Sequence, residues 1–295
     1  MGDKLRKLIR LLIILVGAGI LVYPSVSEYL SEKNSSRAVA SYDTTIVEME
    51  QARRDKLIQS AIDYNKMLAP SAGSRPLEYD DKGKPITLES YRSILDIGEN
   101  GMMGYISVPK LNVTIPIYHG TSEAVLQVGI GHLENSSFPV GGESTHACLS
   151  GHRGLPTAEL FTDLDRMKTG DIFFIKILDR TLCYKVDQIL TVLPQETQEL
   201  AIVNGKDYIT LITCTPYGVN SHRLLVRGVR QEYAEEAPIP IYETDLTDSS
   251  FWSNLPAQYR HMLIGVAAVL IFLILRRIVI IIKNTLKKRR NTLNE

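Results

Sequence analysis

Cys214 ends a strand-like run, residues 208–213, and begins a loop that leads to a second such run, residues 223–227. If the two runs pair as antiparallel neighbours, the thiol of Cys214 and the guanidinium of Arg223 lie side by side at one end of a sheet. A thiol next to a fixed cation can act as a nucleophile, and the cation can stabilise the oxyanion that forms. We therefore take Cys214 as a candidate nucleophile. Arg223 is either its charge stabiliser or a strand-start arginine that lies over the sheet.

A nucleophilic thiol also needs a partner that favours the thiolate, because the pKa of a free cysteine is about 8.5. His152 is flanked by Gly151 and Gly154, shortly after a strand-like run at 146–149. A tight turn there would place its imidazole at a strand end, as expected for Cys214. His222 is nearer to Cys214 in the sequence, and spacing alone does not choose between the two histidines. His152 could equally be a turn histidine without a chemical role.

The other cysteines favour a structural interpretation. Cys148 and Cys183 lie inside apolar strand-like runs, and free cysteine is among the most buried residue types. Three cysteines form at most one disulfide, and no pair has the spacing of zinc ligands. His119 and His132 stand beside glycines and could line a groove. The sequence has no calcium-loop spacing, phosphate loop or dinucleotide fingerprint, so we predict neither metal nor cofactor.

The charges gather at the two ends of the chain. The 295 residues have a formal net charge of zero, but residues 1–10 carry +3, residues 276–295 carry +6 and the middle carries −9. An acidic body between basic ends argues against nucleic-acid binding, which places basic surface on the folded domain. Each basic end borders an apolar run, at 11–23 and 262–275.

These apolar runs predict membrane segments. The first run fits a short anchor or a signal-peptide core, and the lack of a clear small-residue cleavage site favours the anchor. The second can cross a bilayer if Arg276 and Arg277 lie near one face, and a buried core helix is its alternative. The positive-inside rule then places both termini in the cytoplasm and residues 24–261 outside. The lipid bilayer is thus a predicted partner.

Between these ends, the composition changes at about Gly104. Residues 28–68 have sparse apolar positions and many charges, which indicates one or two solvated helices, and residues 70–85 are a long loop by composition. Beyond Gly104, short helices are expected at 123–128 and 158–164, and the last strand should end near Arg230. Short β-branched runs separated by turn residues predict a small barrel or sandwich: 105–108, 113–118, 146–150, 171–178, 182–193, 208–214 and 223–229.

Several of these motifs together resemble one protein family. Residues 150–154 (SGHRG), 210–218 (TLITCTPYG) and 221–228 (SHRLLVRG) resemble the sortases, and the pattern is closest to class C, the pilin-polymerising sortases of Gram-positive bacteria. The resemblance extends over about residues 45–230. The second membrane run after the barrel is also typical of class C. Further matches are 116–120 (PIYHG), 131–133 (GHL), 138–142 (FPVGG) and 160–164 (LFTDL).

The resemblance implies a mainly β fold, an eight-stranded sortase-type barrel, and a cysteine transpeptidase. Cys214 would attack the Thr–Gly bond of an LPxTG-like sorting signal, His152 would protonate the leaving amine, and Arg223 would stabilise the carbonyl oxygen. A lysine amine of a pilin subunit would then resolve the thioacyl enzyme, which makes pilin subunits the expected partners. The resemblance makes His152 the base. The resemblance also implies a substrate groove lined by His132, Thr215, Tyr217 and His222.

Three other functions compete with pilin polymerisation. They are a housekeeping sortase that anchors proteins to the cell wall, a cysteine hydrolase in which water replaces the amine, and a non-catalytic peptide-binding module on the membrane. Class C sortases also usually carry an Asp-Pro-aromatic lid. The loop here lacks that tripeptide, and its candidate lid residues are Leu77, Tyr79 and Asp80.

The predicted domain plan follows from these segments. It comprises a basic end and anchor or signal (1–23), a helical segment (24–68), a lid-like loop (69–86), the catalytic barrel (87–232), a polar tether (233–261), a transmembrane segment (262–282) and a basic cytoplasmic tail (283–295).

Overall fold

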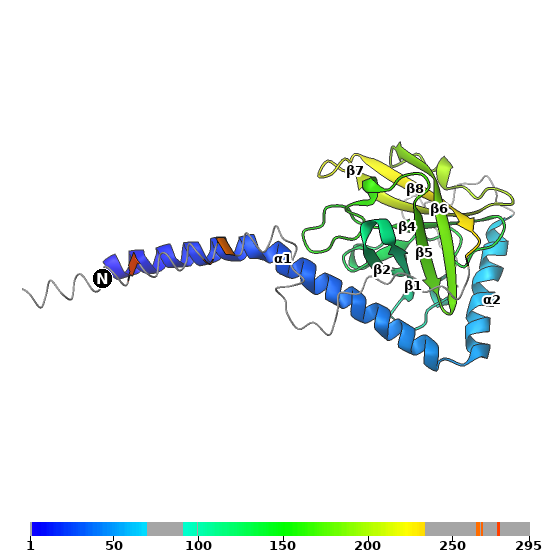
Figure 1. Cartoon of the computed structure of the whole chain (residues 1–295), viewed down its shortest axis with the longest axis horizontal. Coiled ribbons are helices and arrows are strands. Elements are labelled where there is room, and N and C mark those ends of the chain that lie inside the picture. Colours follow the sequence, from blue (N-terminus) through cyan, green and yellow to red (C-terminus); the bar gives the residue numbers. More distant parts are fainter. Residues whose placement is uncertain are drawn as a thin grey trace, which may run out of the picture. The chain divides into compact units, whose positions relative to one another are not determined.

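A computed structural model of the protein describes residues 2–69, 91–98 and 100–233, with positions 264, 265, 267, 276 and 277 (Figure 1). The chain divides into two units, residues 1–29 with 247–295 and residues 30–246. The predicted lid residues Leu77, Tyr79 and Asp80 lie outside the described residues, as do the tether beyond Tyr233 and most of the C-terminal apolar run.

The N-terminal part of the chain is one long helix, α1, Gly2–Glu48, which continues through Pro24. Within the described residues, one helix is long and apolar enough to cross a membrane, the part of α1 from Leu12 to Glu48. Only 6% of its apolar window is buried by the protein. A signal sequence has the same composition, so this helix supports membrane targeting without choosing between an anchor and a cleaved signal.

Eight strands close into a barrel in the order β1-β2-β3-β4-β7-β8-β6-β5. The closed barrel confirms the expected fold class. In a barrel every strand has a hydrogen-bonded neighbour on both sides, so no edge is left open. The strands are β1 Met102–Val108, β2 Val113–His119, β3 Ile130–His132, β4 Thr145–Ser150, β5 Ile172–Ile177, β6 Arg180–Val192, β7 Asp207–Thr215 and β8 His222–Gln231.

Two local elements differ from the sequence prediction. Strand β3 was not predicted, because three residues are too few to show an alternating pattern. The helix predicted at 158–164 is wrong, since this stretch forms turns followed by a 3₁₀ helix, η4, Leu164–Arg166. Leu160 has a φ of 41°, a left-handed conformation that interrupts a right-handed helix. The helix expected at 123–128 is present as α3, Glu123–Leu126.

The end of α1 and the next helix, α2, Gln51–Leu68, pack against the barrel (Figure 1). The hydroxyl of Tyr42 donates to the carbonyl of Met103 (3.0 Å) and accepts from the amide of Leu178 (2.7 Å). Asn65 exchanges two hydrogen bonds with the main chain of Phe138, at 3.0 and 2.7 Å. Because these polar contacts are buried, they fix the helices on the barrel, as expected for charged helices that lean on a larger body.

Candidate active site

Strands β7 and β8 bring Cys214 and Arg223 together. The strands are antiparallel, and the ladder pairs Cys214 directly with Arg223 and Thr215 with His222. Residues that pair directly across a ladder lie on the same face of the sheet, with Cβ atoms about 5 Å apart. The structure thus places Cys214 and Arg223 side by side at one end of the sheet, as the sequence predicts.

The three cysteines differ in burial. Cys148 and Cys183 are 0% and 4% exposed, which confirms that both are core residues, whereas Cys214 is partly exposed. Burial raises the pKa of the Cys148 thiol to about 12 and also raises the pKa of Cys183. A thiol held in its neutral form is a poor nucleophile. Cys214 is therefore the cysteine that remains available for reaction.

The loop that carries His152 leaves the barrel at the same rim. Strand β4 runs parallel to β7, and its last residue, Ser150, pairs with Ile212. Beyond that pair, the amide of Gly151 donates to the carbonyl of Ile212 (3.0 Å), and the hydroxyl of Thr213 donates to the carbonyl of Gly151 (2.8 Å). His152 follows Gly151 directly, so its loop is fastened to the segment of β7 that ends in Cys214.

Arg153 makes a second link between these two segments. Its side chain is only 9% exposed, and it donates to the Thr215 hydroxyl (3.1 Å) and to the carbonyl of Thr162 (3.1 Å) while forming an ion pair with Asp165. Thr215 adjoins Cys214, so Arg153 ties the loop of His152 to the end of β7. Sequence reasoning gave Arg153 no role, although it stands inside the motif around His152.

Arg223 is held by the main chain of its own loop. Its Nη1 donates to the carbonyls of Asn220 (3.3 Å) and His222 (3.1 Å). Within the described part of the chain, no ion pair joins Arg223 to a carboxylate. A guanidinium has five donors in a planar fork, so this one keeps donors for a substrate oxygen next to Cys214.

His152 has an acidic neighbour on α3. Its Nε2 lies 3.4 Å from Oε1 of Glu123, within ion-pair distance although the contact is not a full hydrogen bond. The same oxygen of Glu123 accepts a hydrogen bond from Nε2 of Gln127 (2.6 Å). That hydrogen bond, and then the charge of His152, lower the pKa of the Glu123 carboxyl. Sequence reasoning did not consider Glu123.

The predicted groove residues separate into two groups. Tyr217 is 61% exposed, and its ring packs so closely on Gly154 that a Cβ there would lie 2.6 Å from it. Thr215 and His222 form the ladder pair next to Cys214 and Arg223, and Ser221 contacts the ring of His222. The first group, Thr215, Tyr217 and His222, therefore lies at the same rim as Cys214.

His132 requires a correction. Its side chain is 0% exposed, with Nδ1 2.9 Å from the hydroxyl of Tyr91, Nε2 2.9 Å from the carbonyl of Ser137, and its ring stacked on Phe138. Burial lowers the pKa of this imidazole to about 3. A side chain without exposed surface does not line a groove, so His132 is a core residue. Both ring nitrogens of His119 likewise face main-chain carbonyls, those of Gly101 and Ile94.

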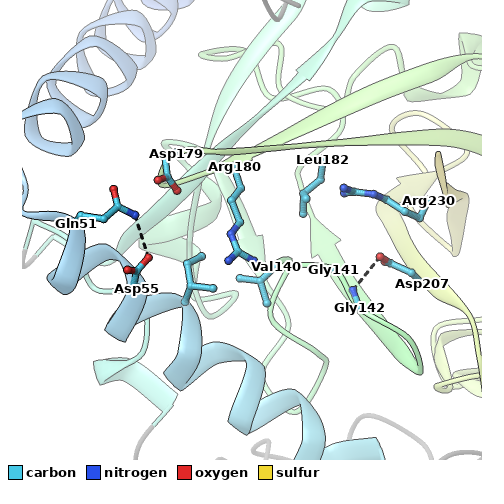
Figure 2. A pocket seen from close by; sticks show the side chains of 11 residues that line it. Gln51, Asp55, Val140, Gly141, Gly142, Asp179, Arg180, Leu182, Asp207 and Arg230 are labelled. Atoms are coloured by element: carbon cyan, nitrogen blue, oxygen red, sulfur yellow. Dashed lines mark hydrogen bonds between the residues drawn. The ribbon is translucent and has the colours of Figure 1, made fainter. Parts of the chain in front are cut away.

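A cavity of about 440 Å³ opens at the other end of the barrel (Figure 2). It is lined by α2, the β5–β6 turn, Asp207 at the start of β7 and Arg230 near the end of β8. A strand rises about 3.3 Å per residue, which puts Asp207 about 23 Å from Cys214 along β7. The cavity is thus separate from the Cys214 rim. Among the described residues, no three His, Cys, Asp or Glu side chains are placed to hold a metal ion.

Comparison with known proteins points to one family. The model of the sortase domain matches residues 106–231. Sortase C1 of Streptococcus agalactiae is 50% identical, with a TM-score of 0.62 over 67% of this chain and 100% of that one. Sortase C of Streptococcus pneumoniae, whose structure was described for catalysis and pilin substrate specificity, is 43% identical, with a TM-score of 0.59 over 69% of this chain and 100% of that one. Sortase A of Staphylococcus aureus is 26% identical over 219 residues, 73% of this chain and 88% of that protein.

Proposed function

The chain belongs to the sortase family of cysteine transpeptidases, and we propose that it is a class C enzyme that joins pilin subunits through Cys214. The ladder pair of Cys214 with Arg223 carries this proposal, because it sets a partly exposed thiol beside a fixed cation. The loop of His152, fastened to the same strand, supplies the imidazole.

The first half of the reaction forms a thioacyl enzyme. The Cys214 sulfur attacks the threonine carbonyl carbon of an LPxTG-like signal, and the carbonyl oxygen becomes an oxyanion beside the Arg223 guanidinium. As the tetrahedral intermediate collapses, the C–N bond to glycine breaks. His152 gives its proton to the leaving amine, so the sulfur holds the acyl group and the cleaved segment departs as a neutral amine.

The second half transfers the acyl group. A lysine amine of another pilin subunit attacks the thioester carbon and gives a proton to His152. The C–S bond breaks, which regenerates the thiolate and leaves an isopeptide amide between two subunits. Exclusion of water at the rim decides between this transfer and hydrolysis.

Identity to the solved class C enzymes supports the pilin assignment. These neighbours are 39 to 50% identical to the chain, whereas sortase A of S. aureus is 26% identical. The S. pneumoniae enzyme was described for its pilin substrate specificity, and we extend that substrate class to this chain. A wall-anchoring function is the alternative.

We further propose that the barrel works outside a bacterial membrane, with both termini in the cytoplasm. The apolar part of α1 and the basic residues at both ends of the chain support this orientation. Reporter domains fused to each terminus in a Gram-positive host test it. A C-terminal reporter active outside the cell would contradict it.

Mass spectrometry tests the chemistry most directly. The barrel with its helical segment, incubated with LPxTG-like peptides, should gain an acyl adduct on Cys214, and Cys214→Ala should gain none. Addition of a pilin fragment that carries an acceptor lysine should convert the adduct to an amide. An acid product alone would favour a hydrolase, and the same turnover in Cys214→Ala would leave only the binding module.

A further inference from the structure

The contact between Glu123 and His152 suggests how the imidazole is oriented. Nε2 of His152 has less than 1 Å² of accessible surface and no hydrogen-bond partner among the described residues, and it lies 3.4 Å from Oε1 of Glu123. A nitrogen shielded from water in this way is satisfied best by a proton that points at the carboxylate. The carboxylate of Glu123 thus contacts Nε2 and not Nδ1.

Glu123 is itself held in place. It begins the short helix α3, and Nε2 of Gln127, one helical turn later, donates to its Oε1 at 2.6 Å. The carboxylate is 70% exposed, so solvent screens its charge more than that of a buried acid. Glu123 should therefore orient the imidazole of His152, and its electrostatic effect on that ring should be well below that of a buried carboxylate.

We propose that Glu123 is the positioning residue for His152. This inference rests on the proposed transpeptidase function. Glu123 holds the proton of the neutral imidazole on Nε2, which makes Nδ1 the nitrogen that takes the proton from the incoming amine. Nδ1 then gives that proton to the leaving amine in the next cycle. An acceptor beside one ring nitrogen keeps the proton of the neutral imidazole on that nitrogen and leaves the other nitrogen free to accept a proton.

Other charged groups pack around the same loop and must be separated from Glu123. Arg153 is engaged with Asp165 and Thr215, and Arg223 is bonded to the main chain of its own loop. The remaining titratable groups on the adjoining segments are Cys214, His222, Glu159, Asp163 and Arg166. Within the described residues, no hydrogen bond or ion pair joins Cys214, His222, Asp163 or Arg166 to the imidazole of His152, so a change at Glu123 should affect His152 first.

Nitrogen-15 NMR of histidine-labelled protein reads the tautomer without turnover. In the Cys214→Ala protein, at a pH high enough to neutralise the ring, we expect His152 in the Nε2–H form. Glu123→Ala in that background should give a mixture of the two tautomers. Glu123→Gln, which keeps an acceptor oxygen, should retain most of the Nε2–H form, and the distant charge removal Glu143→Ala should leave the spectrum unchanged.

Kinetics of the otherwise intact enzyme give the second readout. Glu123→Ala should lower kcat about tenfold with little change in KM for the sorting peptide, because proton transfer and not binding is impaired. Gln127→Ala frees the carboxylate and should lower kcat about two- to threefold by the same reasoning. The pH profile of kcat should change in Glu123→Ala and stay unchanged in Glu143→Ala.

The two proposals fail in different ways. An active enzyme whose His152 tautomer and kcat are the same in Glu123→Ala overturns the positioning role and leaves the transpeptidase intact. Loss of kcat without a change of tautomer also overturns it, because a structural defect explains that result. A wild-type enzyme inactive on all sorting peptides, in which Glu123→Ala still shifts the tautomer, refutes the transpeptidase but keeps the contact.

Discussion

The two ends of the β7–β8 ladder each carry an arginine but differ in the side chain that accompanies it. At one end Cys214 pairs with Arg223, and at the other Asp207 and Arg230 lie at the cavity of Figure 2. Asp207 accepts hydrogen bonds from the amide of Gly142 and the hydroxyl of Tyr184, both at 2.9 Å. Both oxygens of this carboxylate are thus engaged within the fold, which favours a structural role.

At the Cys214 end, the thiol and part of the guanidinium of Arg223 remain available to a substrate. Arg223 is bonded only to carbonyls of its own loop among the contacts described above, and Cys214 is partly exposed. Donors that are open to solvent beside a candidate nucleophile remain available to a substrate oxygen. One strand pair therefore carries a structural rim and a chemical rim, and variants at the two ends should separate activity from stability.

The largest expected effect is that of Cys214→Ala. Loss of the nucleophile should lower kcat/KM for a sorting peptide by about 10⁴-fold or more. The unfolding free energy should hardly change, because the side chain is partly exposed and the substitution leaves no large cavity. Peptide transfer assayed beside urea denaturation measures both quantities. Cys183→Ala, in the core, should give the reverse result.

Arg223→Ala should have the next largest effect. Removal of an oxyanion stabiliser costs about 10² to 10³ in kcat, with little change in thermal midpoint. Arg230→Ala removes the same charge at the other end of the same strand and is the matched control. Equal losses of activity in both variants would show that net charge, and not position beside Cys214, is what matters.

Arg153→Ala should affect both activity and stability. Its loss leaves the Thr215 hydroxyl and the Asp165 carboxylate without their partner. We expect about 2 kcal/mol lower stability and about tenfold lower kcat, because the histidine loop loses a link to the nucleophile strand. Steady-state kinetics and urea denaturation should show both, and the exposed Arg166→Ala should show neither. A loss of stability alone would restrict Arg153 to a structural role.

Asp207→Ala should have the smallest effect on activity. The variant leaves the amide of Gly142 and the hydroxyl of Tyr184 unpaired, which should cost about 1–3 kcal/mol of stability. Below the new unfolding transition, kcat/KM should stay within about twofold of the wild-type value, because the residue lies at the structural rim. A large loss of activity in folded protein would refute the separation of the two rims.

The pH dependence of that variant gives a finer test. Burial raises the pKa of Asp207 above its ordinary 3.8, so the folded protein binds this proton more tightly than the unfolded chain. The resulting stabilisation is present below pH 3.8 and is lost as the pH rises through the folded-state pKa. The stability difference between wild type and Asp207→Ala should thus be larger at about pH 4 than at about pH 8. A stability difference between the two proteins that does not change with pH would contradict the raised pKa of Asp207.

Much of the barrel could be predicted because its strands are short runs of β-branched residues that end at turn residues. The antiparallel pairing of Cys214 with Arg223 also followed, since one loop joins the two runs. Strand β3 and the left-handed Leu160 could not be predicted, because their conformations depend on neighbours distant in sequence. His132 illustrates the same limit, since a histidine beside a glycine can face the core or a groove.

By itself, the sequence determined the candidate reactive side chains, because Cys214, His152 and Arg223 stand at strand ends within recognisable motifs. Tertiary structure decided what surrounds them. Closure of the barrel places β4 beside β7, which joins Arg153 to Thr215, and the helix between β2 and β3 brings Glu123 to His152. Such contacts link residues far apart in the chain, so they depend on packing geometry that local propensity does not encode.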